Sequence, residues 1–272
     1  MPVLDIVILT LITFVVLVGS IVGVLLLHRK NRLPLATRIL VPTAAVLLSL
    51  SVSTLVYLNL YSHATEEAND GLLSDATTQV TETNDYYYFD NLENQDNAII
   101  FYGGGKIEEK AYAPLAKRLS SAGIDVFLLK MPFHFPLFGI DKADSVRSSN
   151  LNYSHVYLMG HSLGGTCASM CLSKSVQNYE GIIFLASFPN AQLQENRKAL
   201  SIYGSNDKVL NLDSYEKAKP HFPKDTSTYV IEGGNHAGFA YYGDQSGDGV
   251  ASISRQTQID LTVGYVSSLF HP

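Results

Sequence analysis

The chain has 272 residues, 46% of them hydrophobic, and a formal net charge of −6 at pH 7. This length is sufficient for one domain with a substantial core together with additional segments. The charge is unevenly distributed, because the first 61 residues carry four Lys or Arg and one Asp, which leaves 15 basic and 24 acidic residues in the remainder. Nucleic-acid binding needs a basic face, so the acidic remainder argues against a nucleic-acid partner.

The amino-terminal part predicts a transmembrane helical hairpin. Two apolar runs, at about residues 3–27 and 39–61, are each long enough to cross the hydrocarbon core of a bilayer. The first run lacks the basic flank of a signal peptide and is too long for one. The segment 28–38 between the runs is basic, and the positive-inside rule keeps it in the cytoplasm. We therefore predict a multi-pass protein of the cell membrane, held in the lipid bilayer by residues 3–61, with everything that follows on the extracytoplasmic side.

Residues 62–84 are polar and predict a tether, followed by a domain over residues 85–272. In this domain, apolar runs typical of buried strands alternate with segments of helical periodicity. The expected strands are 85–89 at a sheet edge, 97–102, 124–131, 156–159, 181–187, 199–203 and 228–231, and the expected helices are 112–122, 141–147, 166–176, 212–219 and 254–270. This alternation predicts an α/β fold with a mostly parallel sheet, helices on both faces and a site at the carboxyl ends of the strands.

One motif is typical of a catalytic nucleophile. The apolar run 156–159 leads into Gly160-His161-Ser162-Leu163-Gly164, and a helical stretch without Pro or Gly follows at 166–176. A serine hydroxyl is a poor nucleophile unless it is exposed, aimed and next to a base. A sharp strand-to-helix turn aims the side chain, and the flanking glycines avoid collisions of a Cβ in the crowded turn. The pattern therefore predicts Ser162 as the nucleophile.

Two further residues complete a candidate triad. Asp207 lies in the loop after the strand 199–203, and His236 lies in the loop after the next strand, 228–231. The order Ser, Asp, His along the chain is the order that a Gly-x-Ser-x-Gly nucleophile requires on this kind of sheet. We predict that His236 takes the proton of Ser162 and that Asp207 fixes the tautomer of the imidazole.

A tetrahedral intermediate carries a negative charge that needs two preplaced N–H donors. The first expected donor is the backbone N–H of Leu163, directly after the nucleophile. The second is expected from the glycine loop after Tyr102, at Gly104 or Gly105. A phosphate cradle is the alternative for three consecutive glycines, but the loop lacks both Gly-x-Gly-x-x-Gly and a Gly-Lys-Ser/Thr ending.

Other polar residues near these motifs receive lesser roles. His134 follows a strand end and is a candidate pocket residue. His161 precedes the nucleophile and is expected to pack beside the pocket. Asp244 and Asp248 lie in a glycine-rich loop, but their spacing does not match an EF-hand, so no metal site is predicted.

Together these motifs resemble the α/β-hydrolase superfamily over about residues 88–271. The matching features are Gly-His-Ser-Leu-Gly-Gly at 160–165, Tyr-Gly-Gly-Gly at 102–105, Gly-Ser-Asn-Asp-Lys-Val at 204–209 and Gly-Gly-Asn-His-Ala-Gly-Phe at 233–239. Segments 127–133 and 247–255 look similar to the compact bacterial hydrolases grouped near dienelactone hydrolases. Those enzymes use a cysteine nucleophile, so the serine at 162 favours general ester hydrolysis over lactone hydrolysis.

The predicted function is hydrolysis of a small-molecule carboxylic ester, or less readily a thioester or amide, without a cofactor. The short segment between the strands 181–187 and 199–203 leaves no room for a bulky lid, which favours small acyl groups. One alternative is an acyltransferase with the same triad, in which an alcohol replaces water. Another is a catalytically silent binding protein on this fold, against which the intact triad argues. The sequence makes no prediction of the oligomeric state.

Overall fold

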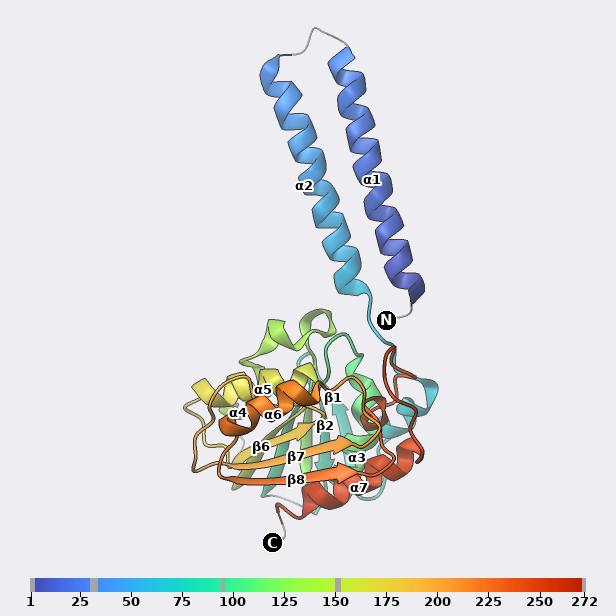
Figure 1. The fold of residues 1–272 in the computed structure, drawn as a ribbon. Helices are drawn as coiled ribbons and strands as arrows, with labels where there is room; N and C mark the ends of the chain where they lie inside the picture. Colours follow the sequence, from blue (N-terminus) through green and yellow to red (C-terminus); the bar gives the residue numbers. More distant parts are fainter. Residues whose placement is uncertain (1–2, 30–33, 94–95, 150–152, 271–272) are drawn as a thin grey trace. The chain divides into compact units, whose positions relative to one another are not determined.

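The computed structural model describes residues 3–29, 34–93, 96–149 and 153–270. The chain divides into two compact units, Met1–Tyr61 and Ser62–Pro272. The first unit consists of two helices, α1 (Val3–Arg29) and α2 (Leu35–Asn59), which pack side by side (Figure 1). A hydrogen bond of 2.8 Å joins the hydroxyls of Thr13 and Ser53 across this pair. Both apolar runs are therefore helical, as expected from their composition.

The two helices differ in how well they fit a membrane. Ile39–Asn59 of α2 is 21 residues long, is apolar enough to cross a bilayer, and has only 6% of its apolar window buried. In the part of α1 whose side chains are described, the apolar stretch is the shorter Leu11–Leu26. Length and composition thus fit one crossing by α2, and the two-helix transmembrane hairpin stays a prediction.

The prediction of a tether over residues 62–84 is wrong, because these residues fold as part of the second unit. The 3₁₀ helix η1 (Glu66–Leu72) is followed by β1 (Thr78–Glu82), which pairs antiparallel with β2 (Tyr86–Asn91). The Ser62 N–H also donates to the Lys106 carbonyl at 2.7 Å. The polar composition misled the prediction, because an edge strand with one solvated face needs few apolar residues.

The described residues of the second unit form one eight-stranded sheet with the strand order β1-β2-β4-β3-β5-β6-β7-β8. The pairs β1–β2 and β2–β4 are antiparallel, whereas all the pairs from β4 to β8 are parallel. The parallel strands are β3 (Asn97–Tyr102), β4 (Asp125–Leu129), β5 (His155–His161), β6 (Gly181–Leu185), β7 (Lys198–Gly204) and β8 (Asp225–Ile231). The expected mostly parallel α/β sheet is confirmed, although the predicted edge strand at 85–89 is second from the edge.

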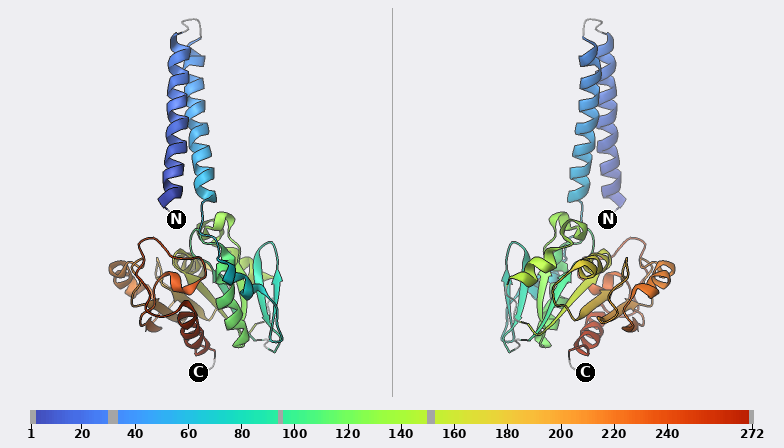
Figure 2. Two further views of the ribbon diagram at one scale, coloured as in Figure 1. Left: turned by 90° about the vertical axis from the view of Figure 1, so that its right-hand side faces the viewer. Right: turned by 90° about the vertical axis from the view of Figure 1, so that its left-hand side faces the viewer.

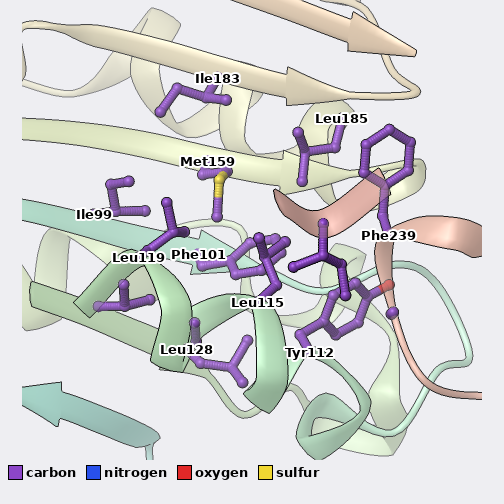
Figure 3. Packing of buried hydrophobic residues seen from close by; sticks show 14 of the residues in the cluster. Ile99, Phe101, Tyr112, Leu115, Leu119, Leu128, Met159, Ile183, Leu185 and Phe239 are labelled. Atoms are coloured by element: carbon purple, nitrogen blue, oxygen red, sulfur yellow. The ribbon is translucent and has the colours of Figure 1, made fainter. Parts of the chain in front are cut away.

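Alternating residues of the buried strands build a core on each face of the sheet. One core contains Ile99 and Met159, and the helices on that face are α3 (Ala113–Ser121) and α7 (Arg255–Ser267) (Figures 1 and 2). Figure 3 shows how strand side chains of this core meet those of α3, with Ile99 beside Leu119 and Phe101 beside Leu115. The other core lies under α4 (Lys142–Ser148), α5 (Leu163–Lys174) and α6 (Leu212–Ala218). Burial on both faces explains why these strands are continuous apolar runs in the sequence.

Candidate active site

Ser162 lies at a strained turn between β5 and α5. Its backbone angles are φ 52° and ψ −126°, a conformation that non-glycine residues rarely adopt and that concentrates at functional sites. A Cβ added to Gly160 would lie 2.3 Å from the backbone of the following helix. A Cβ added to Gly164 would lie 2.2 Å from a backbone carbonyl oxygen of the glycine loop. Both glycines are therefore required by the turn, as the sequence motif predicted.

Asp207 and His236 follow the neighbouring parallel strands β7 and β8, so their loops meet at one edge of the sheet. The His236 Nδ1 lies 2.8 Å from the Asp207 Oδ2, and both residues are buried. The other carboxylate oxygen accepts the backbone N–H groups of Val209 and Leu210, at 2.8 Å each. These bonds orient the carboxylate, which in turn fixes the proton of the imidazole on Nδ1 and leaves Nε2 as an acceptor.

The acceptor nitrogen of His236 is unpaired among the described residues, and the ring lies next to the residue before Ser162. The Nε2 atom is buried and has no hydrogen-bond partner among the described residues, so it is not bonded to the Ser162 hydroxyl in this structure. The ring of His236 lies 4.7 Å from the ring of His161, the residue directly before Ser162. A buried acceptor without a partner is costly and uncommon. Catalytic hydrogen bonds are often long in ligand-free sites and shorten when the substrate binds.

The structure separates the two glycines predicted as oxyanion donors. The Gly104 N–H is already engaged, because it donates to the Tyr112 hydroxyl at 2.8 Å. The Gly105 N–H has no acceptor within the described part of the chain, and a Cβ at Gly105 would lie 2.8 Å from Leu163 Cδ2. Leu163 is the first residue of α5, and its N–H is among those that a helix leaves without an internal acceptor. Gly105 and Leu163 are therefore the candidate oxyanion donors, and Gly104 is not.

A buried relay of hydrogen bonds joins the glycine loop to the loop of His236. The His161 Nε2 lies 3.1 Å from the His236 carbonyl oxygen, which can only accept, so Nε2 carries the proton. The Nδ1 of His161 is then an acceptor and receives the Tyr112 hydroxyl at 2.8 Å. Burial, and next the neighbouring His236, hold the pKa of His161 well below its usual range. His161 is thus a neutral structural link and not only a packing neighbour.

His134, the other candidate pocket histidine, supports the glycine loop from outside. Its Nδ1 lies 2.7 Å from a carboxylate oxygen of the buried Glu109, and its carbonyl accepts the Lys106 N–H at 2.6 Å. These hydrogen bonds link His134 to Glu109 and Lys106, and those described for Asp207 and His236 do not involve it. Its contribution is to hold the residue directly after Gly105.

Sequence reasoning missed several residues that hold the site together. The Tyr112 hydroxyl and the Gln258 amide act from helices distant in sequence, and Gln258 bonds both the N–H and the carbonyl of Asn235, at 3.0 and 2.8 Å. Asp248, which the sequence weighed only as a cation ligand, accepts the Ala237 N–H at 2.9 Å. These bonds fix the backbone on both sides of His236. No sequence motif could reveal them, because each depends on packing between distant segments.

The fold and this arrangement of residues define a hydrolase of the α/β class. The chain belongs to the alpha/beta hydrolase family, because the model of that family matches residues 98–260. No curated protein is significantly similar to the sequence.

Solved structures with a similar fold include hydrolases. An esterase/lipase from an uncultured bacterium has a TM-score of 0.54 and 14% identity, over 74% of this chain and 88% of that one. EstE5, solved after soaking with ethyl alcohol, has a TM-score of 0.54 and 13% identity over the same shares. MGS-M1, an alpha/beta hydrolase enzyme from a Medee basin deep-sea metagenome library, has a TM-score of 0.52 and 12% identity, over 73% of this chain and 100% of that one. At these identities the likeness establishes the fold.

Proposed function

We propose that the protein is a serine hydrolase that cleaves carboxylic esters through an acyl-enzyme on Ser162. The observation that carries the proposal is the Asp207–His236 pair, whose Nε2 has no partner among the described residues and whose ring lies 4.7 Å from the ring of His161, directly before a serine held in a strained strand-to-helix turn. This combination supplies a nucleophile, a base and an orienting carboxylate, the three groups that serine catalysis needs.

In the proposed mechanism, the Ser162 oxygen attacks the ester carbonyl carbon while its proton passes to the His236 Nε2. Asp207 stabilises the imidazolium through its 2.8 Å bond to Nδ1. The N–H groups of Gly105 and Leu163 would receive the negative charge on the carbonyl oxygen. The bond to the alcohol then breaks, and the alcohol leaves with the proton of His236. A water molecule attacks the acyl-enzyme by the same steps and releases the acid.

Labelling with a fluorophosphonate probe tests this proposal. We expect the detergent-solubilised protein to be labelled and Ser162→Ala to remain unlabelled, because the probe requires an activated serine. His236→Gln should label far more slowly, since it removes the base but keeps the nucleophile. Equal labelling of the wild type and Ser162→Ala, or none of the wild type, would overturn the proposal.

The acyl preference of the proposed site is for short chains. The segment between β6 and β7, residues 186–197, contains neither helix nor strand and provides no lid. Nitrophenyl esters of increasing chain length measure this preference directly through kcat/KM. An optimum at long acyl groups would contradict it.

We also propose that α1 and α2 anchor the chain in the cell membrane and that the hydrolase unit lies on the extracytoplasmic side. The basic segment between the helices supports this orientation through the positive-inside rule. Protease added to intact cells should digest the hydrolase unit. If the unit is digested only after the cells are broken, the topology is the reverse of the one proposed, with the hydrolase unit in the cytoplasm.

A further inference from the structure

A surface of exposed aromatic side chains lies between β4 and α4. We refer to residues 132–139, which form the 3₁₀ helices η3 (Pro132–His134) and η4 (Pro136–Gly139), as the aromatic loop. Its side chains Phe133, Leu137 and Phe138 are 43%, 42% and 54% exposed. The rings of Phe133 and Phe138 are 6.0 Å apart, so these side chains form one apolar surface and not isolated exposed residues. Clustered apolar surface of this kind marks interaction sites.

The aromatic loop is held in a strained conformation that keeps these rings outside the core. Phe133 and His134 both have positive φ, at 55° and 53°, which is unfavourable for bulky residues. The buried carboxylate of Glu109 holds the loop in place, because it accepts the Met131 N–H at 2.8 Å and lies 2.7 Å from the His134 Nδ1. Strain that the surrounding structure maintains is characteristic of functional segments.

The aromatic loop adjoins the candidate active site. The Phe135 ring packs against Phe138 with centroids 5.6 Å apart, and a Cβ at Gly105 would lie 3.5 Å from Phe135 Cε2. The His134 carbonyl accepts the Lys106 N–H at 2.6 Å. The exposed rings are therefore next to the proposed oxyanion donor.

The length of the chain after α2 limits how far this region can lie from a membrane. The helix α2 ends at Asn59, and the Ser62 N–H is bonded to the Lys106 carbonyl at 2.7 Å. Three residue steps span about 10 Å at full extension. This bound applies at every angle between the helix and the hydrolase unit. If α2 crosses the bilayer, the glycine loop and the aromatic loop bonded to it must lie close to the membrane surface.

We propose that the aromatic loop inserts Phe133, Leu137 and Phe138 into the interfacial layer of the bilayer in which the chain is anchored. The active site would then open next to the membrane surface. The transfer of apolar rings from water to the boundary between headgroups and acyl chains lowers their free energy. The inference rests on the proposed membrane anchoring and adds the surface through which the hydrolase unit meets the lipid.

Fluorescence provides a sharp test because the chain contains no Trp. Phe138→Trp makes a protein with a single Trp in the aromatic loop, and Val176→Trp provides the matched control. Val176 is 96% exposed and follows the end of α5, whose 12 residues place it about 18 Å along the helix from the serine turn. The full-length variants are reconstituted in phosphatidylcholine vesicles with and without acyl chains brominated near the carbonyl.

We expect brominated lipid to quench most of the Phe138→Trp emission and to leave the Val176→Trp emission unchanged. Equal emission of Phe138→Trp in both kinds of vesicle overturns the inference, and a blue-shifted but unquenched Trp would mean that a protein partner, such as a second copy, covers the loop instead. Quenching of both variants also overturns it, because contact would not be specific to the aromatic loop.

Two parallel measurements separate this inference from the proposals on which it depends. Vesicle flotation reports the anchoring, so a protein that floats without quenching of Phe138→Trp refutes the loop insertion alone. A protein that does not float refutes the anchoring, and the insertion with it. Fluorophosphonate labelling of both Trp variants reports the folded active site independently of either result.

Discussion

At the scale of single residues, the site depends on groups that never touch the substrate in the proposed mechanism. Tyr112 is the central one, because its hydroxyl accepts from Gly104 and donates to His161. Through His161 and the His236 carbonyl, one relay fixes both the glycine loop and the base. Sequence motifs predict Ser162, Asp207 and His236 as the triad but leave Gly104 and Gly105 as alternative oxyanion donors, and the Tyr112 hydroxyl, eight residues after Gly104, engages the Gly104 N–H. A motif cannot reveal such a bond.

Tyr112→Phe tests this relay. The change removes one oxygen and leaves the Gly104 N–H and the His161 Nδ1 buried without partners, which should destabilise the protein by about 1–3 kcal/mol. Because the glycine loop then loses its fixed position, kcat should fall more than KM changes. Thermal unfolding and ester hydrolysis measure the two effects. Tyr157→Phe is the control, since its hydroxyl bonds Glu180 at 2.9 Å, and a similar fall in kcat there would contradict a specific role of the relay.

The neutral His161 predicts a pH dependence of stability. Its pKa in the folded protein is lowered from the ordinary 6.5 by burial, so the unfolded chain binds a proton that the folded chain does not. The free energy of unfolding therefore keeps its full value above pH 6.5. Below that pH it falls by about 1.4 kcal/mol per pH unit for this one group. Unfolding of wild type and His161→Gln between pH 5 and 7.5 measures it, with a shallower loss expected in the variant. Parallel profiles would exclude a buried neutral His161.

At the scale of elements, the strand-to-helix turn is where sequence and structure agree best. The apolar strand, the flanking glycines and the helix were predicted from the motif, because each responds to local sterics that any such turn imposes. The segment 62–84 failed for the opposite reason, since β1 is defined by pairing with β2 and not by its own residues. Buried parallel strands can be predicted from apolar runs in the sequence, whereas edge strands lack such runs.

Two glycine substitutions should therefore have opposite effects on stability. Gly164→Ala places a Cβ 2.2 Å from the Gly103 carbonyl oxygen, and the rigid backbone there should cost about 1–3 kcal/mol or more, with loss of fluorophosphonate labelling. Gly264→Ala in α7 meets nothing within 4 Å, and an alanine inside a helix should stabilise it by about 0.5–1 kcal/mol. Thermal unfolding of both variants measures the difference. Destabilisation by Gly264→Ala would mean that α7 packs more closely than its surroundings indicate.

At the scale of the whole molecule, the folded core and the proposed membrane anchor belong to different units of the chain. Every residue of the two hydrophobic cores follows residue 62, and so do the candidate triad and the glycine loop. The helices α1 and α2 instead expose large apolar side chains along their length, such as Phe14 and Leu48, which are 62% and 66% exposed. Removing them takes nothing from the cores of the hydrolase unit.

We therefore expect residues 62–272 to fold without the helices and to keep their reactivity toward fluorophosphonate and short soluble esters. Their thermal unfolding should be cooperative, because one sheet with two cores remains intact. Flotation with phosphatidylcholine vesicles should be lost, since the aromatic loop alone offers three apolar side chains, too few for stable anchoring. An unfolded or inactive fragment would show that the helices stabilise the hydrolase unit, and a fragment that still floats would place the main membrane contact in that unit.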